Sequence, residues 1–206
     1  MFGTPEIQSL PKNVVLTDDP LRAKMLVAHH LEYSTPVYEQ DEVLIYSGGY
    51  KGVPIAVVSA GFGHGAVLLC LDELIKPGVE KVIYISACAS SIGHVGIGSV
   101  VLASGGSSGI FNKAITAAAK FGITASTQPV TSSCVTSPED GCITEDTTHK
   151  LYEQASDACV EALSILTVSD NTLSGEKMEE HEIRSRFYAA SRLAFETFAL
   201  EIENSS

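Results

Sequence analysis

The sequence is short of positive charge. Its 206 residues contain 13 lysines and arginines against 25 aspartates and glutamates, which gives a formal net charge of −12. Nucleic acids and anionic membranes bind basic surfaces, so this balance argues against either as a partner. A small anionic substrate is still compatible with it, because one local arginine can outweigh distant charges that salt screens.

Paired cysteine motifs and long apolar runs are also missing. No Cys-x-x-Cys motif occurs, and the number of cysteines is odd: Cys70, Cys88, Cys134, Cys142 and Cys159. We expect reduced, mostly buried thiols. The start, MFGTPEIQSLPKN, has neither the basic end nor the apolar core of a signal peptide, and no run is long enough to span a membrane. We therefore predict a cytoplasmic protein without a membrane partner.

Signatures of metal and dinucleotide sites are absent as well. His29 and His30 are adjacent and cannot share one helix face, and the other four histidines are scattered, so we predict no bound metal. The glycine-rich stretch Gly61–Gly65 lacks the full Gly-x-Gly-x-x-Gly spacing. A backbone cradle for a small ligand and a tight turn both explain these glycines.

Apolar runs alternate with helical patterns along the chain. The predicted strands are Val14–Thr17, Val43–Tyr46, Pro54–Ser59, Lys81–Ser86, Ser99–Ala103, Ile123–Thr131 and Ala162–Ser169. The predicted helices are Pro20–Leu31, His64–Lys76, Ile110–Phe121, Thr147–Glu161 and Glu179–Ile202. Most of the strand runs are continuously apolar, which is typical of strands covered on both faces. The alternation predicts a single α/β domain over residues 1–206 with a mixed sheet.

The stretch NVVLTDDPLRAK, Asn13–Lys24, joins a buried strand to a helix. Asp19 fits the N-cap and Pro20 the first helical position. A helix that starts after a strand commonly forms an anion site, because free N–H groups and the helix dipole point there. Asp18 and Asp19 nevertheless place two carboxylates at this junction, so phosphate binding and simple capping both stay open.

Two further strand ends carry candidate residues. The small residues Ser86–Ser90 would let a ligand approach the backbone at the carboxyl edge of the sheet, although a crowded strand crossing explains them too. Cys88 has no flanking cation, which favours a buried structural thiol over a nucleophile. Asp170 ends the run LSILTVSDN, where it could act as a general acid or cap the following turn.

Together these pieces resemble the nucleoside phosphorylase superfamily, specifically the hexameric bacterial purine nucleoside phosphorylases. The similarity runs in order through TPEI, VVLTDDPLRAK, YSGGYKGVPIAVVSAGFGHG, DELIKPGVEKVIYISACAS, GHVGIGSVVLAS, AAAKFGI, TSPEDG and ALSILTVSDN. The resemblance implies a three-layer α/β/α domain around a mixed, partly barrel-like sheet, assembled as a homo-oligomer, either a dimer or a ring of dimers. It also implies cleavage of the glycosidic bond of purine nucleosides, with phosphate as co-substrate and no metal or organic cofactor.

The resemblance assigns roles to individual residues. Asp170, assisted by Arg184, would protonate the departing purine, although a count from Asp170 places Ile183 at the family's arginine position. The phosphate site would include Arg22, Asp18 and Ala87. The nucleoside would be bound by Phe62, Glu145, Ser169 and Glu6.

Several family contacts are replaced. Asp18-Asp19-Pro20 stands where the family has Gly-Asp-Pro, and two unit charges about 4 Å apart repel by about 4 kcal/mol at an effective dielectric constant of 20. Asp18 thus opposes phosphate unless its side chain turns away. Other expected contacts fall on Tyr84 and Ala87 (phosphate), Gln40 and Glu6 (from a neighbouring subunit), Glu145-Asp146-Thr147 (ribose) and Val135 or Thr136 (base).

Two functions therefore stay open. One is an enzyme of nucleoside salvage that cleaves a purine nucleoside by phosphorolysis or by hydrolysis, and the missing arginines fit hydrolysis somewhat better. The other is a catalytically impaired relative that serves as a nucleoside-binding or regulatory subunit. The retained Asp170 and Arg22 favour the enzyme.

Overall fold

The computed structural model describes residues 9–133, 141–179, 182 and 185–203. Ten strands in this part of the chain form one mixed sheet in the order β2-β3-β4-β1-β5-β10-β6-β7, with β9 attached to β5 and β8 attached to β9. The strands are β1 (Asn13–Thr17), β2 (Tyr33–Gln40), β3 (Val43–Tyr50), β4 (Val53–Ser59), β5 (Lys81–Ser90), β6 (Val100–Ala103), β7 (Ala125–Gln128), β8 (Val130–Thr131), β9 (Ile143–Thr144) and β10 (Glu161–Asn171). The helices are α1 (Pro20–His30), α2 (His64–Ile75), α3 (Ser108–Phe121), α4 (Thr148–Asp157) and α6 (Tyr188–Glu203).

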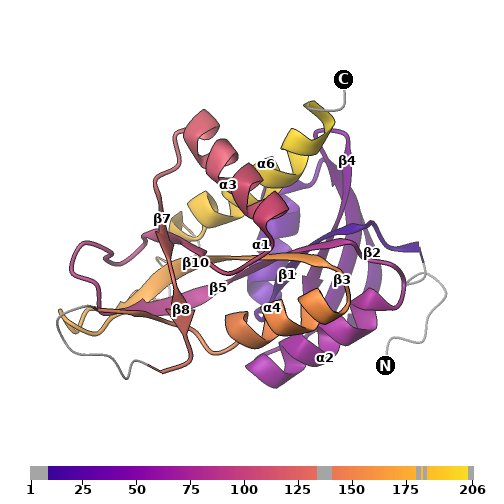
Figure 1. Cartoon of the computed structure of the whole chain (residues 1–206). Coiled ribbons are helices and arrows are strands. Elements are labelled where there is room, and N and C mark those ends of the chain that lie inside the picture. The colour runs from indigo at the N-terminus through magenta and orange to yellow at the C-terminus, as the bar shows by residue number, and fades with distance from the viewer. Residues whose placement is uncertain (1–8, 134–140, 180–181, 183–184, 204–206) are drawn as a thin grey trace.

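Helices cover both faces of the sheet (Figure 1). On one face α1, α3 and α6 pack against the strands through buried side chains such as Leu26, Ile110 and Phe198. On the other face α2 and α4 do so through Leu71 and Leu151. This arrangement confirms the predicted α/β class, with helical layers on either side of a mixed sheet.

The middle of the sheet is parallel. β1 runs parallel to β4 and β5, and β10 runs parallel to β5. The carboxyl ends of these four strands therefore meet at one edge. In open α/β sheets this edge is where ligands bind.

The structure corrects several predicted elements. The strand β2 was not predicted, because its residues are polar and mostly exposed and Pro36 interrupts it; it is an edge strand that pairs only with β3. The predicted helix Thr147–Glu161 ends at Asp157, and Glu161 already belongs to β10. The predicted strand Ile123–Thr131 is two short strands, β7 and β8.

The predicted closing helix is interrupted. The predicted span was Glu179–Ile202; the described residues 182, 185 and 186 in it are helical, the chain turns at Phe187, and α6 then runs from Tyr188 to Glu203. The Phe187 side chain is only 3% exposed and lies against the guanidinium of Arg22. The turn thus carries a buried side chain that packs against the first turn of α1.

The cysteines differ from expectation at one described position. Cys70 and Cys88 are free and buried, and Cys159 is free and exposed. Cys142, however, is disulfide-bonded, so the prediction of reduced thiols is wrong there. The sequence spacing did not reveal this bond, because disulfide bonding depends on loop geometry. The backbone N–H of Cys142 donates to Ser91 Oγ at 2.7 Å, which holds this loop against the end of β5.

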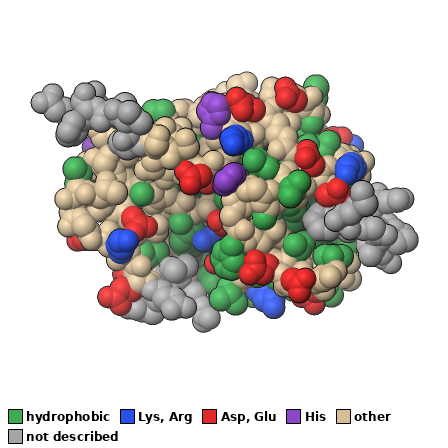
Figure 2. All heavy atoms as spheres, turned by 90° about the horizontal axis from the view of Figure 1, so that it is seen from below, with side chains coloured by type: hydrophobic (Ala, Val, Ile, Leu, Met, Phe, Trp, Pro, Cys, Tyr) green, Lys and Arg blue, Asp and Glu red, His purple; other side chains and the backbone are tan. Residues whose placement is uncertain are grey.

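No helix in the described ranges combines the length and the apolar character needed to cross a membrane. The face covered by α2 and α4 shows acidic side chains scattered among apolar ones, with the basic side chains separate from one another (Figure 2). No continuous basic patch lies on the described part of this face.

Candidate active site

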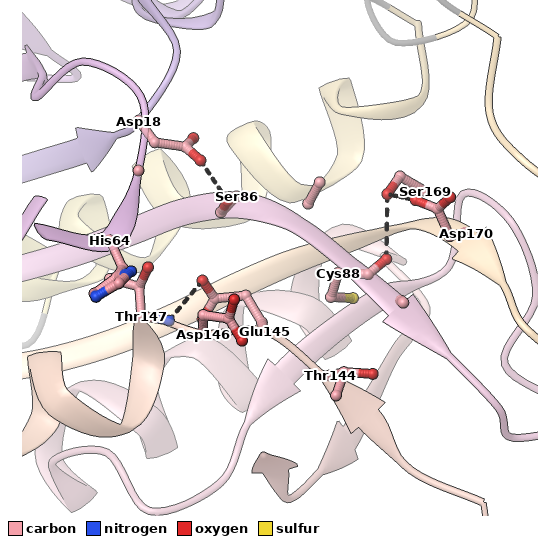
Figure 3. Close-up of a pocket in the computed structure, with 13 residues that line it drawn as sticks. Asp18, His64, Ser86, Cys88, Thr144, Glu145, Asp146, Thr147, Ser169 and Asp170 are labelled. Carbon is pink, nitrogen blue, oxygen red and sulfur yellow. Dashed lines mark hydrogen bonds between the residues drawn. The ribbon is translucent and has the colours of Figure 1, made fainter. Parts of the chain in front are cut away.

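A pocket of about 490 Å³ lies at the carboxyl edge of the parallel strands (Figure 3). Its lining residues come from the ends of β1, β5, β9 and β10 and from the starts of α2 and α4: Asp18, Gly63, His64, Ser86, Ala87, Cys88, Ala89, Thr144, Glu145, Asp146, Thr147, Ser169 and Asp170. Four of these residues are carboxylates, and none is lysine or arginine. The described lining is thus strongly acidic.

Asp18 forms one end of this pocket. Arg22 Nη1 donates to its Oδ1 at 2.6 Å, and Ser86 Oγ donates to its Oδ2 at 3.1 Å. Both carboxylate oxygens therefore have a donor, one from the first turn of α1 and one from β5. The neighbouring Asp19 is the N-cap of α1, because its Oδ1 accepts the N–H of Leu21 at 2.8 Å, as predicted.

Arg22 is buried behind Asp18 and does not line the pocket. The residue is 8% exposed, and its Cζ lies 4.3 Å from the centroid of the Phe187 ring. Besides Asp18, its Nη1 donates to Thr17 Oγ1 at 3.0 Å. The anion contact predicted for Arg22 is thus made with a carboxylate of the same chain.

Tyr84 is a buried, uncharged group next to this end of the pocket. Its side chain is 1% exposed, and its hydroxyl interacts with the side chains of Ser86 and Thr147. Burial raises the pKa of Tyr84 far above its usual value, and the nearby Asp18 and Glu145 raise it further. Tyr84 therefore adds a neutral hydroxyl where the resemblance placed an arginine.

Asp170 and Ser169 form the other end of the pocket. Ser169 Oγ lies 2.7 Å from Asp170 Oδ2 and 3.3 Å from the carbonyl oxygen of Cys88. The pairing of β10 with β5 slips between Val168 and Asp170, so Ser169 is an extra residue in the strand. This bulge lets two consecutive side chains line the same pocket, which a regular strand does not allow.

The Asp170 carboxylate is partly exposed. Its side chain is 38% accessible, and Lys177 Nζ lies 3.5 Å from its Oδ1, with the lysine side chain 80% exposed. The carboxylate is therefore open to solvent and to a ligand, unlike that of Asp18.

Glu145 lies between the two ends and binds the start of α4. Its Oε1 accepts the N–H of Thr147 at 2.9 Å, and its Oε2 accepts that of Thr148 at 2.7 Å. These are free N–H groups of a helix start, so the carboxylate acts as a cap there. The ribose-binding role predicted for Glu145 would compete with this cap.

Ala87 and Cys88 form the floor between the two ends. Burial raises the pKa of the Cys88 thiol to about 12, and the negative charges of Glu145 and Asp170 add to the shift. The thiol is therefore protonated at neutral pH, which agrees with a structural cysteine rather than a nucleophile.

The glycine-rich stretch after β4 forms a tight turn and also borders the pocket. Gly61 and Gly63 have φ of 83° and 98°, a region that favours glycine. Gly63 precedes α2 and lines the pocket with His64, so the tight turn is confirmed and the cradle for a small ligand stays a prediction. Phe62 is 63% exposed and is not among the lining residues of this single chain.

Other predicted positions fall elsewhere. Arg184 and Glu6, as well as Ile183, Val135 and Thr136, lie outside the described residues. Gln40 ends the edge strand β2, where its Oε1 accepts the hydroxyl of Tyr38 at 2.7 Å. It does not line the pocket of this chain.

Sequence reasoning missed several lining residues, among them His64 and Thr144. His64 follows the glycine turn and is exposed, and the predicted start of α2 at this residue was the available signal. Thr144 belongs to the two-residue strand β9, which no periodicity could reveal. The described residues include no cluster of three or more histidine, cysteine or acidic side chains arranged for a metal ion.

Comparison with known proteins identifies the family of the chain. A family model described as "Phosphorylase superfamily" matches residues 12–129, which is more than half of the chain. The chain belongs to the phosphorylase superfamily. The matched segment of this superfamily member includes Asp18, Arg22 and Ser86, whereas Glu145 and Asp170 follow it.

Curated relatives extend the similarity over most of the chain. A DeoD-type purine nucleoside phosphorylase of Aliivibrio salmonicida is 27% identical over 234 aligned residues, covering 95% of this chain and 98% of the relative. One of Shewanella oneidensis is 29% identical, covering 90% and 93%. The crystal structure of purine nucleoside phosphorylase from Toxoplasma gondii in complex with immucillin-H superposes with a TM-score of 0.84 at 14% identity, covering 96% of this chain and 94% of that one. This superposition supports the fold.

Proposed function

We propose that this phosphorylase superfamily member cleaves the N-glycosidic bond of a purine nucleoside. The observation that carries the proposal is the Asp170 carboxylate, which lines a pocket at the ligand-binding edge of the family's sheet and is accessible from it. The names of the curated relatives, purine nucleoside phosphorylases, support the substrate class.

In the proposed reaction Asp170 is the general acid. The bond between the sugar C1′ and the base nitrogen breaks, the base takes the bonding electrons, and the Asp170 carboxyl group transfers its proton to the base. Ser169 Oγ, 2.7 Å from Oδ2, holds the carboxyl group in place. The oxygen of phosphate or of water bonds to C1′, and no metal or organic cofactor is required.

The test measures release of free base from inosine, adenosine and uridine, with and without phosphate. We expect release from the purine nucleosides, and we expect Asp170→Asn to lower it at least about 100-fold, in the range typical of a lost general acid. Lys177→Met removes the exposed cation next to the same carboxylate and controls for a change in local charge. Release that survives in Asp170→Asn would show that another group is the acid.

A second candidate is a nucleoside-binding subunit without activity. The observation that favours it is that Glu145 is engaged as a helix cap and Asp18 as an ion-pair partner, so neither is free for a substrate. This candidate predicts a rise in melting temperature with inosine but no release of hypoxanthine. The first candidate predicts both.

A further inference from the structure

We propose that Asp18 is a built-in ligand of an oxyanion cradle, so that free phosphate is excluded from this pocket. The cradle consists of Arg22 Nη1, Thr17 Oγ1 and Ser86 Oγ. The binding claim is independent of any activity. One consequence rests on the proposed function: when the protein cleaves a nucleoside, the nucleophile is water.

The geometry is that of a bound anion. Asp18 Oδ1 accepts from Arg22 Nη1 at 2.6 Å and lies 3.4 Å from Thr17 Oγ1. Asp18 Oδ2 accepts from Ser86 Oγ at 3.1 Å. A charged donor and a strand hydroxyl therefore hold the two oxygens of one carboxylate, as they would hold two oxygens of a free oxyanion.

The cradle can hold one anion, and the chain supplies it. The Asp18 side chain is 26% exposed and that of Arg22 is 9% exposed, so the pair is largely shielded from water. A second anion would have to displace Asp18 from Arg22 or lie next to it. If Asp18 is displaced, its carboxylate loses its cation in a pocket that Glu145 and Asp146 also line. If the second anion lies next to Asp18, two negative charges stand together with little screening.

The rest of the described lining offers no positive charge that would attract phosphate in place of Arg22. It contributes Glu145, Asp146 and Asp170 but no lysine or arginine. The guanidinium of Arg22 is turned toward Phe187, behind Asp18. The pocket therefore suits a neutral or cationic ligand and repels phosphate.

For the reaction this means hydrolysis. The oxygen of water bonds to C1′ as the bond from C1′ to the base breaks, and the base takes the bonding electrons and the proton of Asp170. The proton released by the water returns through solvent to the Asp170 carboxylate. The products are free base and free ribose, and water is the co-reactant consumed.

Calorimetric titration with inorganic phosphate tests the cradle directly. We expect no saturable binding to the wild type and, for Asp18→Ala, a phosphate affinity at least about tenfold higher, because the variant frees Arg22 and Ser86 for the added anion. Asp18→Asn keeps the cradle filled with a neutral amide and should not gain this affinity. Asp146→Asn removes one negative charge from the same lining without opening the cradle, and it should behave as the wild type does.

Thermal denaturation shows whether a folding defect of Asp18→Ala affects the result. Asp18→Ala leaves Arg22 with only the more distant carboxylate of Asp19, whose Oδ2 lies 3.9 Å from Nη2, so we expect a lower melting temperature that phosphate restores and that chloride at equal ionic strength does not. If the variant folds only in phosphate, selective recovery on refolding supports the cradle. The proposal is overturned if Asp18→Ala folds in neither salt or if the wild type binds phosphate as tightly as Asp18→Ala does. It is also overturned if Asp146→Asn gains as much phosphate affinity as Asp18→Ala.

A measurement of activity distinguishes failure of this proposal from failure of the proposed function. Release of base from inosine by the wild type should be independent of phosphate, and release that requires phosphate would refute the exclusion. If no base is released at all, the proposed function fails, while the titrations still decide whether Asp18 fills the cradle.

Discussion

The two ends of the pocket hold their carboxylates in opposite ways. At one end Asp18 pairs with the buried Arg22, whose side chain is 9% exposed, and with the hydroxyl of Ser86. At the other end Asp170 faces Lys177, whose side chain is 80% exposed. Figure 3 shows Asp18 and Asp170 on opposite sides of the cavity.

The difference separates a carboxylate held by the scaffold from the one that we propose as the general acid. A carboxylate whose cation is buried in the fold has little capacity left for a ligand. Asp170 also has a donor at each oxygen, Ser169 Oγ at 2.7 Å and Lys177 Nζ at 3.5 Å, but its side chain is 38% exposed and its cation lies at the surface, so it stays accessible. The same residue type therefore serves the scaffold at the end of β1 and is available for chemistry at the end of β10.

The largest effect that tests this comparison is on stability. Arg22→Met leaves Asp18 without its cation and should lower the free energy of unfolding by about 3 kcal/mol, the lower end of the range for breaking a shielded ion pair. The matched variant Lys177→Met breaks the exposed pair and should cost less than about 0.5 kcal/mol. Urea unfolding followed by circular dichroism measures both. Equal losses in the two variants would contradict the distinction.

A medium effect is expected at Glu145, the carboxylate between the two ends. Glu145→Ala leaves the N–H groups of Thr147 and Thr148 without their acceptor and should cost about 1–2 kcal/mol, as the loss of a helix cap does. Asp146→Ala, next to it and exposed, is the matched control and should cost less than about 0.5 kcal/mol. If the two urea midpoints coincide, Glu145 is free to bind ribose and belongs with Asp170.

The smallest effect depends on pH and concerns the last residue of α1. His30 Nε2 lies 2.8 Å from Ser191 Oγ, and its ring stacks on Phe195 at 4.5 Å. Burial, followed by the charge of His29, lowers the pKa of His30 to about 4. The unfolded chain takes up a proton near pH 6.5 and the folded chain does not, so this contribution to stability is complete above that pH and is lost as the pH falls toward 4.

Unfolding free energies measured at two pH values check this sign. Between about pH 7.5 and pH 5.5 the wild type should lose about 1 kcal/mol more than His30→Gln does. His149→Gln, which changes an exposed histidine on α4, should follow the wild type. A wild-type loss no larger than that of His30→Gln would mean that the fold does not lower the pKa of His30.

Much of the fold could be predicted because local signals coincided with it. Asp19 and Pro20 fixed the start of α1, and the continuous apolar run of β10 identified a central strand. The strand β2 escaped because an exposed edge needs no apolar pattern. The turn before α6 escaped because Phe187, the residue at this turn, is buried against Arg22, and no local pattern reveals a contact between residues so far apart in the sequence.

The candidate site was predictable in part of its residues but not in their partners. Asp18 and Asp170 were candidates from the sequence itself and Glu145 from the family resemblance, and the spacing of four residues allowed an ion pair between Asp18 and Arg22. That Ser86 would complete the binding of Asp18 required the register of β1 with β5. That Glu145 would cap α4 required knowing that the helix begins only at Thr148.

The extra residue in β10 has a consequence for how such a pocket can change. Because Ser169 has no partner on β5, its presence shifts everything that follows by one position relative to the neighbouring strand. Gain or loss of a single codon there would exchange the side chain offered to the cavity while the layers beneath stay as they are. New chemistry could therefore arise at this spot by small insertions and deletions, without a new core.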